Sequence, residues 1–259
     1  KMAVNKLEKV TGKQLSDIEG DDINSFLRIY GKEVSDITLR SKYQLLSSVY
    51  NFLYSHKYIS FNPVQFTDPP KATVIYKKPL TELELEKIKN VCEKLPLKES
   101  LRNMAIIHFF VSTGCRVSEL CKVKMEDLDL ENKICKVKGK GKKERPVVLS
   151  DRACYRIKLY LGTRENISPA SPLFAHIRGD EIEMTKDGVE RMLQKLRRNA
   201  GVENLTCHTF RRFYATELRR RGVNIQMIAT SLGHANLNQI NRYSLYNQQE
   251  LIDTIRKSM

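Results

Sequence analysis

A proline-rich stretch sets the strongest limit on how this chain can fold. Four of its eight prolines lie between residues 63 and 79. Proline lacks a backbone N–H and disfavours helix at the residue before it, so no continuous helix crosses this stretch. The chain has 259 residues, enough for a hydrophobic core on each side. We therefore expect a domain at 1–68, a linker at 69–78 and a second domain at 79–259.

The first domain carries a helical pattern of apolar side chains. Leu39, Tyr43, Leu46 and Tyr50 follow one another at steps of three or four residues, the spacing of one helix face. Thr38 is a suitable N-cap for this helix. A shorter helical run precedes it and ends at Gly31. Residues 1–68 are therefore predicted to form a small helical bundle.

The second domain mixes helical runs with one strand pattern. Thr81 and Glu84 have the spacing of a capping box, which predicts a helix start after Pro79. Residues 133–149 ("KICKVKGKGKKERPVVL") indicate a strand, a glycine turn and a strand, and "PLFA" could be a third strand. Further helical runs end at Gly114, Gly201, Gly222 and Gly233. The predicted fold class is mainly α with a small antiparallel sheet (α+β).

Charge and cysteine content narrow the function. The chain has 45 lysines and arginines against 30 aspartates and glutamates, a net charge of +15, which favours a polyanionic partner. No apolar run reaches the roughly 18 residues of a membrane span, and the first residues lack a secretory apolar core. The six cysteines form no Cys-x-x-Cys pair. We expect buried free thiols in a reducing compartment, no metal site and no cofactor.

Basic side chains gather in two short motifs of the second domain. His208 and Arg211 are three residues apart near a predicted helix start, so they share one helix face where an anion is favoured. Arg116 follows the glycine that ends an apolar helix, and Glu119 lies three residues further on, close enough to hold its guanidinium. Taken singly, each pair also fits an ordinary surface or structural role.

The predicted hairpin adds a lysine-rich turn. Lys140 lies between two glycines, and a lysine on such a turn can reach a scissile phosphate. The other basic side chains there are expected to contact phosphate or solvent; they are Lys136, Lys138, Lys142, Lys143 and Arg145.

A histidine and two tyrosines complete the set near the end of the chain. His234 follows Gly233, Tyr243 comes nine residues later and Tyr246 three residues after that. Arginines can neutralise a pentacoordinate phosphorane, a task often given to a metal ion. Nearby cations help a tyrosine to lose its proton and attack, and a lysine can protonate the leaving oxygen. Together these groups suit metal-free attack on a phosphodiester.

Four motifs, in this order, resemble those of the tyrosine recombinase (phage-type integrase) family of site-specific DNA recombinases. They are "TGCRVSEL", "GKGKKER", "HTFRR" and "LGH" followed nine residues later by tyrosine. The resemblance covers the whole chain and is either Xer-like or closer to a transposon integrase. It implies a helical core-binding (SAM-like) domain at 1–68 and a catalytic domain of the DNA breaking-rejoining type at 79–259.

The resemblance also implies a role for each motif residue. Tyr243 would be the nucleophile that forms a 3′-phosphotyrosyl intermediate, with Tyr246 as a packing or backup residue. Lys140 would be the general acid, and Glu119 would support the first arginine. The remaining catalytic residues would be Arg116, His208, Arg211 and His234. DNA contacts are expected from Arg40, Lys42, Lys138, Lys142, Lys143, Arg145 and Arg212.

The same resemblance implies partners and a location. A homotetramer would synapse two duplexes at a specific double-stranded site and exchange strands through a Holliday junction, without ATP or metal. The tail, with Leu251, Ile252 and Ile255, would dock on a neighbouring protomer or fold back on its own. The protein is expected in the cytoplasm, at the nucleoid. The first domain looks one helix short of the family pattern, which suggests a trimmed N-terminus.

Three other functions stay open from the sequence. A type IB topoisomerase uses nearly the same chemistry on one strand, and a catalytically silent DNA-binding regulator would keep the basic surface. A metal-dependent nuclease could use the acids of "MEDLDLEN", namely Glu126, Asp127, Asp129 and Glu131, although they have the pattern of a solvated turn. Dimer resolution, transposon resolution and integration are not distinguished.

Overall fold

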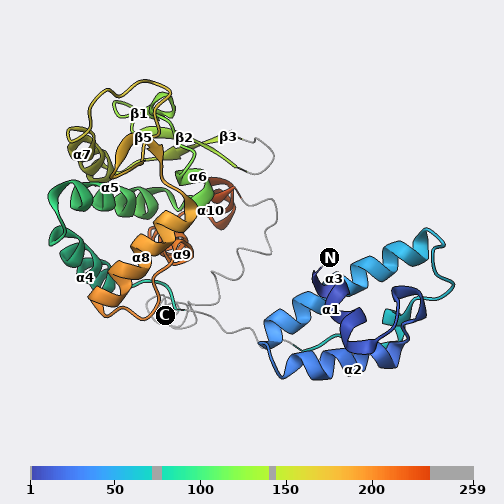
Figure 1. The fold of residues 1–259 in the computed structure, drawn as a ribbon. Helices are drawn as coiled ribbons and strands as arrows, with labels where there is room; N and C mark the ends of the chain where they lie inside the picture. The colour runs from blue at the N-terminus through green and yellow to red at the C-terminus, as the bar shows by residue number, and fades with distance from the viewer. Residues whose placement is uncertain (1, 72–77, 140–143, 234–259) are drawn as a thin grey trace, which may run out of the picture. The chain divides into compact units, whose positions relative to one another are not determined.

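The computed structural model describes residues 2–71, 78–139 and 144–233. The chain divides into two compact units, Lys1–Tyr76 and Lys77–Met259, each with its own core. Figure 1 shows the first unit as helices alone and the second as helices with small sheets at one edge. This mainly helical architecture with small antiparallel sheets confirms the predicted fold class.

Residues 2–71 of the first unit form a bundle of three helices with two short 3-10 turns. The elements are α1 (Met2–Thr11), η1 (Leu15–Asp17), α2 (Gly20–Gly31), α3 (Asp36–Ser55) and η2 (Pro63–Phe66). Tyr43, Leu46 and Tyr50 of α3 are buried in its core, as the helical spacing predicts. The N-cap prediction was wrong by one turn: Ser35 caps α3, because its side-chain oxygen accepts from the N–H of Thr38.

The second unit is built around a buried central helix, α5 (Leu97–Thr113). Three longer helices pack against or near it, namely α4 (Glu82–Glu93), α7 (Asp151–Leu161) and α9 (Cys207–Arg220), while α8 (Lys186–Ala200) packs on α4. The remaining elements are α6 (Val117–Leu120), η3 (Met125–Asp127) and α10 (Ile225–Leu232). The predicted capping box of α4 is present, with reciprocal hydrogen bonds between Thr81 and Glu84.

The described residues of the second unit form two small antiparallel sheets, one more than the sequence predicted. The first has the order β1 (Leu128–Asp129), β2 (Ile134–Lys138) and β3 (Glu144–Val148). The second pairs β4 (Ala175–His176) with β5 (Gly179–Glu183), so the "PLFA" strand begins at its last residue. Strands β2 and β3 form the predicted hairpin, with Lys138 opposite Glu144 and Val137 opposite Arg145. The bend of that hairpin, 140–143, lies outside the described residues.

The cysteine and membrane predictions can be compared with the described part of the chain. All six cysteines are free and buried, as expected. Burial raises the pKa of the Cys115 thiol to about 12, so it stays protonated at neutral pH. No helix within the described ranges combines the length and the apolar character that a bilayer crossing needs.

Gly114 ends α5 in a conformation that only glycine fits. Its φ is +57°, in the left-handed region. A Cβ at this position would lie 2.5 Å from Cδ1 of Tyr214 on α9 and 2.9 Å from Cδ2 of Leu232 on α10. Gly201 ends α8 with a similar φ of +61°, but a Cβ there would meet nothing within 4 Å. The close approach at Gly114 therefore fixes how α9 and α10 pack against the end of α5.

These two glycines make a matched test of that packing. Gly201→Ala is expected to lower the free energy of unfolding by about 1 kcal/mol, the cost of a left-handed alanine. Gly114→Ala adds steric overlap to the same backbone cost and is expected to lose about 2–4 kcal/mol. Urea unfolding of both variants measures the difference. Equal losses would show that the packing at Gly114 is not restrictive.

Candidate active site

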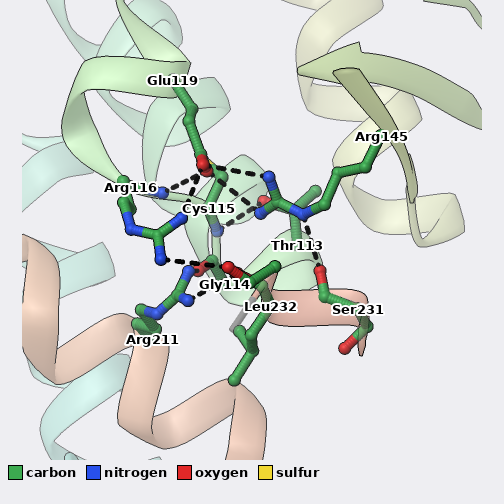
Figure 2. Close-up of polar contacts among 10 residues, drawn as sticks. Thr113, Gly114, Cys115, Arg116, Glu119, Arg145, Arg211, Ser231 and Leu232 are labelled. Atoms are coloured by element: carbon green, nitrogen blue, oxygen red, sulfur yellow. Dashed lines mark hydrogen bonds and ion pairs between the residues drawn. The ribbon is translucent and has the colours of Figure 1, made fainter. Parts of the chain in front are cut away.

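Three arginines from three elements meet at the end of α10. Arg116 directly precedes α6, Arg145 lies on β3, and Arg211 lies on α9. Figure 2 shows their guanidinium groups converging between Glu119 and the last residues of α10. The motifs that the sequence treats separately are therefore joined in one site.

Glu119 is the buried acceptor of this site. Its side chain is 1% exposed and binds Nη1 of Arg116 at 2.9 Å and Nη1 of Arg145 at 3.0 Å. It also accepts from the backbone N–H of Arg116 at 2.8 Å and from Nη2 of Arg145 at 3.0 Å. Burial alone would raise the pKa of Glu119, but hydrogen bonds from Arg145 and Arg116 outweigh it and hold the pKa below its ordinary value. The carboxylate stays ionised between two cations.

The C-terminus of α10 supplies the second set of acceptors. Three successive carbonyl oxygens each accept from a different arginine: Nε of Arg145 binds O of Ser231 at 2.9 Å, Nη2 of Arg211 binds O of Leu232 at 2.6 Å, and Nη2 of Arg116 binds O of Gly233 at 3.3 Å. The last carbonyls of a helix have no partner within it and carry the negative end of its dipole. The arginines thus fix the point from which the chain leads to His234.

Arg211 ties this end to the core. It is 3% exposed, and its Nη1 donates to O of Gly114 at 2.8 Å. His208 lies one turn before Arg211 on α9. The neighbouring Phe210 stacks on Phe110 of α5, with ring centroids 5.6 Å apart. The position of Arg211 is therefore set by the packing of α9 on α5.

A cavity of about 510 Å³ opens beside Arg116 and Arg211. Its polar lining comes from α8 and α9 as well as from Arg116, and includes Lys186, Glu190, His208, Arg211 and Arg212. His208 and Arg211 line the same cavity, as their spacing predicts. The cavity walls desolvate the partly exposed ring of His208, and this desolvation, with the charges of Arg212, Arg211 and Arg116, lowers its pKa. The lowered pKa favours the neutral imidazole, which can donate one hydrogen bond to an anion.

The base of the hairpin is anchored by acidic side chains. Nζ of Lys138 lies 3.4 Å from Oδ1 of the buried Asp127 and 3.9 Å from Oε1 of Glu144. Asp127 also accepts from the backbone N–H of Lys124. Asp129 accepts from the backbone of Glu131 and from Asn132, so both aspartates stabilise local turns. Within the described ranges no three His, Cys, Asp or Glu side chains gather as a metal site would require.

Several predicted site residues are not placed. Lys140, Lys142, Lys143, His234, Tyr243 and Tyr246 lie outside the described residues. Arg40 is exposed on α3 and Lys42 is partly exposed there, in the first unit. Lys138 is 37% exposed and Arg145 only 15%. The DNA contacts predicted for these residues and for Arg212 stay predictions.

The role of Arg145 inside the protein was not predicted from the sequence. We expected a side chain turned toward phosphate or solvent, whereas each of its three guanidinium nitrogens has an intramolecular partner. The sequence does hold a signal for this. Arg145 lies two residues before the buried Val147 on β3, and side chains two residues apart on a strand point to the same face of the sheet. The inward face of β3 therefore brings Arg145 to Glu119.

Similarity to known proteins agrees with this geometry. Residues 78–250 match the family model described as the phage integrase family. The tyrosine recombinase XerC of Thermodesulfovibrio yellowstonii is 33% identical over 238 residues, covering 88% of this chain and 77% of that protein. XerA of Pyrococcus horikoshii is 34% identical over 191 residues, covering 73% of this chain and 64% of that protein.

Solved structures of recombinases share the fold. XerH bound to a palindromic difH substrate superposes with a TM-score of 0.74 at 22% identity, covering 96% of this chain and 75% of that chain. The Tn1549 transposon integrase in complex with transposon right end DNA gives a TM-score of 0.76 at 19% identity, covering 93% and 87%. Fold and sequence together define a tyrosine recombinase. The chain belongs to the phage integrase family.

Glu119→Gln tests how far the carboxylate holds the site together. The change keeps the shape but leaves two guanidinium groups without a carboxylate, and we expect a loss of about 3 kcal/mol in the free energy of unfolding at pH 7. Glu93→Gln is the control, because its ion pair with Arg156 is exposed at 53% and 28% and is worth at most about 1 kcal/mol. Urea unfolding measures both.

The pH dependence of the free energy of unfolding tests whether Glu119 is ionised in the folded protein. The pKa of Glu119 is lower in the folded protein than its ordinary value of 4.5, so its contribution is present above that value and is lost as the pH falls below it. The difference in the free energy of unfolding between wild type and Glu119→Gln should therefore become smaller in acid. A difference that is constant from pH 7 to pH 3 would contradict an ionised, stabilising Glu119.

Proposed function

We propose that this protein is a site-specific DNA recombinase or integrase that cuts and rejoins DNA through a 3′-phosphotyrosyl intermediate. The observation that carries the proposal is the convergence of Arg116, Arg211 and His208 on one cavity of a tyrosine recombinase fold. Guanidinium groups and a neutral imidazole at one site suit a phosphate that gains negative charge as it reacts.

The proposed chemistry has two transesterifications. The phenol of Tyr243 loses its proton to solvent and its oxygen attacks the scissile phosphorus. The P–O bond to the 5′ oxygen breaks, and Lys140 gives that oxygen a proton. Arg116 and Arg211 stabilise the phosphorane, with hydrogen bonds from His208 and His234. The 5′ hydroxyl of a partner strand then returns a proton to Lys140 and attacks the phosphotyrosine. The P–O bond to Tyr243 breaks, and the phenol oxygen regains a proton from solvent. Bond energy is kept throughout, so neither ATP nor a metal ion is needed.

The two units would divide the work on DNA. The unit at 1–68 would bind the core site and the unit at 79–259 would cut it, with 69–78 as the linker. Arg40 and Lys42 on α3, and Lys138, Lys142, Lys143 and Arg212 in the second unit, would contact the backbone. Helices α3 and α8 are the elements proposed to enter the major groove. Phosphate contacts of this number give binding that weakens steeply with salt.

The assembly proposed is a homotetramer on two synapsed duplexes. Strand exchange between duplexes requires more than one active site, and the C-terminal tail would pass between protomers to link them. The XerH and Tn1549 integrase structures hold those recombinases on DNA. A DNA substrate also supports the predicted place at the nucleoid in the cytoplasm.

A covalent-trapping experiment tests the proposal. The substrate is a nicked duplex with the sequence that the wild-type protein itself recovers from a random-sequence pool. We expect a protein–DNA adduct that is stable to denaturation and forms equally in EDTA. Tyr243→Phe should abolish it, because the phenylalanine has no oxygen to attack with, whereas Tyr246→Phe should keep the wild-type yield.

The other outcomes discriminate among functions. An adduct that still forms in Tyr243→Phe but is lost in Tyr246→Phe would show that Tyr246 is the nucleophile. Relaxation of supercoiled plasmid without a preferred site would favour a type IB topoisomerase. Binding without any adduct would favour a silent regulator, and cleavage that EDTA abolishes would favour a nuclease.

A further inference from the structure

We propose that Arg145 is a positioning residue of this recombinase: it fixes the end of α10 and offsets the charge of Glu119, so that Arg116 remains able to stabilise phosphate. The inference rests on the proposed function and gives Arg145 a role inside the protein rather than on DNA.

The contacts of Arg145 form a fork that only a guanidinium can make. Nη1 and Nη2 bind the two carboxylate oxygens of Glu119, both at 3.0 Å, while Nε binds O of Ser231 at 2.9 Å. Its Cδ, Nε and Cζ also lie 3.4–3.5 Å from where a Cβ on Gly233 would be, so its stem packs against the last turn. A planar group with several fixed donors can hold both partners at once, and lysine cannot.

The charges explain why the second arginine matters. With Glu119 and Arg116 alone, the carboxylate would cancel the positive charge of the arginine that faces the cavity. With Arg145 added, two cations share one anion, and the cluster keeps one net positive charge next to the cavity. That net charge is what a phosphorane needs, because electrostatic stabilisation depends on the charge that the site presents.

The position of Arg145 links two parts of the proposed chemistry. It lies on β3, next to Glu144, whose carboxylate neighbours Lys138 at the base of the hairpin. Its other end holds α10 directly before His234. One side chain therefore joins the strand that follows the hairpin bend to the chain that leads to the proposed nucleophile.

The rate of adduct formation on the nicked duplex defined above, at saturating protein, tests this role. Arg145→Ala should slow adduct formation by about 100-fold, the effect of misplacing reacting groups by about an ångström. Arg145→Lys keeps the charge without the fork and should fall between Arg145→Ala and wild type. Arg156→Ala, which removes a partly exposed arginine paired with Glu93, should cleave at the wild-type rate.

Binding of the uncleaved site separates positioning from DNA contact. For a positioning residue, the dependence of affinity on salt is unchanged in Arg145→Ala. Loss of a phosphate contact would instead lower the slope of log affinity against log salt by about 1. A slope lowered in this way, wild-type cleavage by Arg145→Ala, or full cleavage by Arg145→Lys would each overturn the proposal.

Hydrogen exchange gives a readout that needs no DNA. The amides of the last turn of α10 should exchange faster in Arg145→Lys than in wild type, while those of α5 stay protected. If wild-type protein forms no adduct, the proposed function fails, and the exchange of α10 still decides whether Arg145 holds that helix. If wild type forms the adduct and α10 is unaffected in the variant, only the role of Arg145 fails.

Discussion

The second unit depends on one buried carboxylate shared by two guanidinium groups. Glu119 is 1% exposed, and the penalty for burying its charge is offset only because Arg116 and Arg145 reach it from different elements. The same arginines extend to the carbonyls that end α10, and Arg211 joins them from α9. One electrostatic cluster thereby joins α6, β3, α9 and α10, and Figure 2 shows the polar contacts that make it up.

The packing of the helices makes this cluster possible. Gly114 lets α9 and α10 approach the end of α5, and its carbonyl oxygen receives Arg211. Because the cavity lies beside these contacts, its lining is positively charged and already arranged in the protein without DNA. Preformed charge of this kind stabilises a transition state without reorganisation during the reaction.

Much of this could be predicted from the sequence where the signal is local. The capping box at Thr81 and Glu84, the hairpin and the Arg116–Glu119 pair each depend on residues close in the chain. Helix α7 was not predicted, although Ser150 is an N-cap that could have revealed it. Strand β5 pairs over a few residues with a charged face, which leaves little pattern to detect.

The partners of Arg145 could not be predicted from local pattern, although its place two residues before the buried Val147 indicates an inward face. Its partners Glu119 and Ser231 lie 26 and 86 residues away, so only the folded chain brings them together. In a lysine-rich hairpin, the sequence pattern predicts that a basic residue is one more phosphate contact. Burial distinguishes it from its neighbours, and burial is a property of the tertiary structure.

The central claim is that a tyrosine oxygen, activated among these cations, takes the DNA phosphate. Tandem mass spectrometry of the trapped adduct, after nuclease digestion of the DNA and proteolysis of the protein, locates the modified residue directly. The account predicts a nucleotide joined through phosphate to Tyr243, in adduct formed without divalent metal. A nucleotide carried by a serine, a histidine or another tyrosine would contradict it.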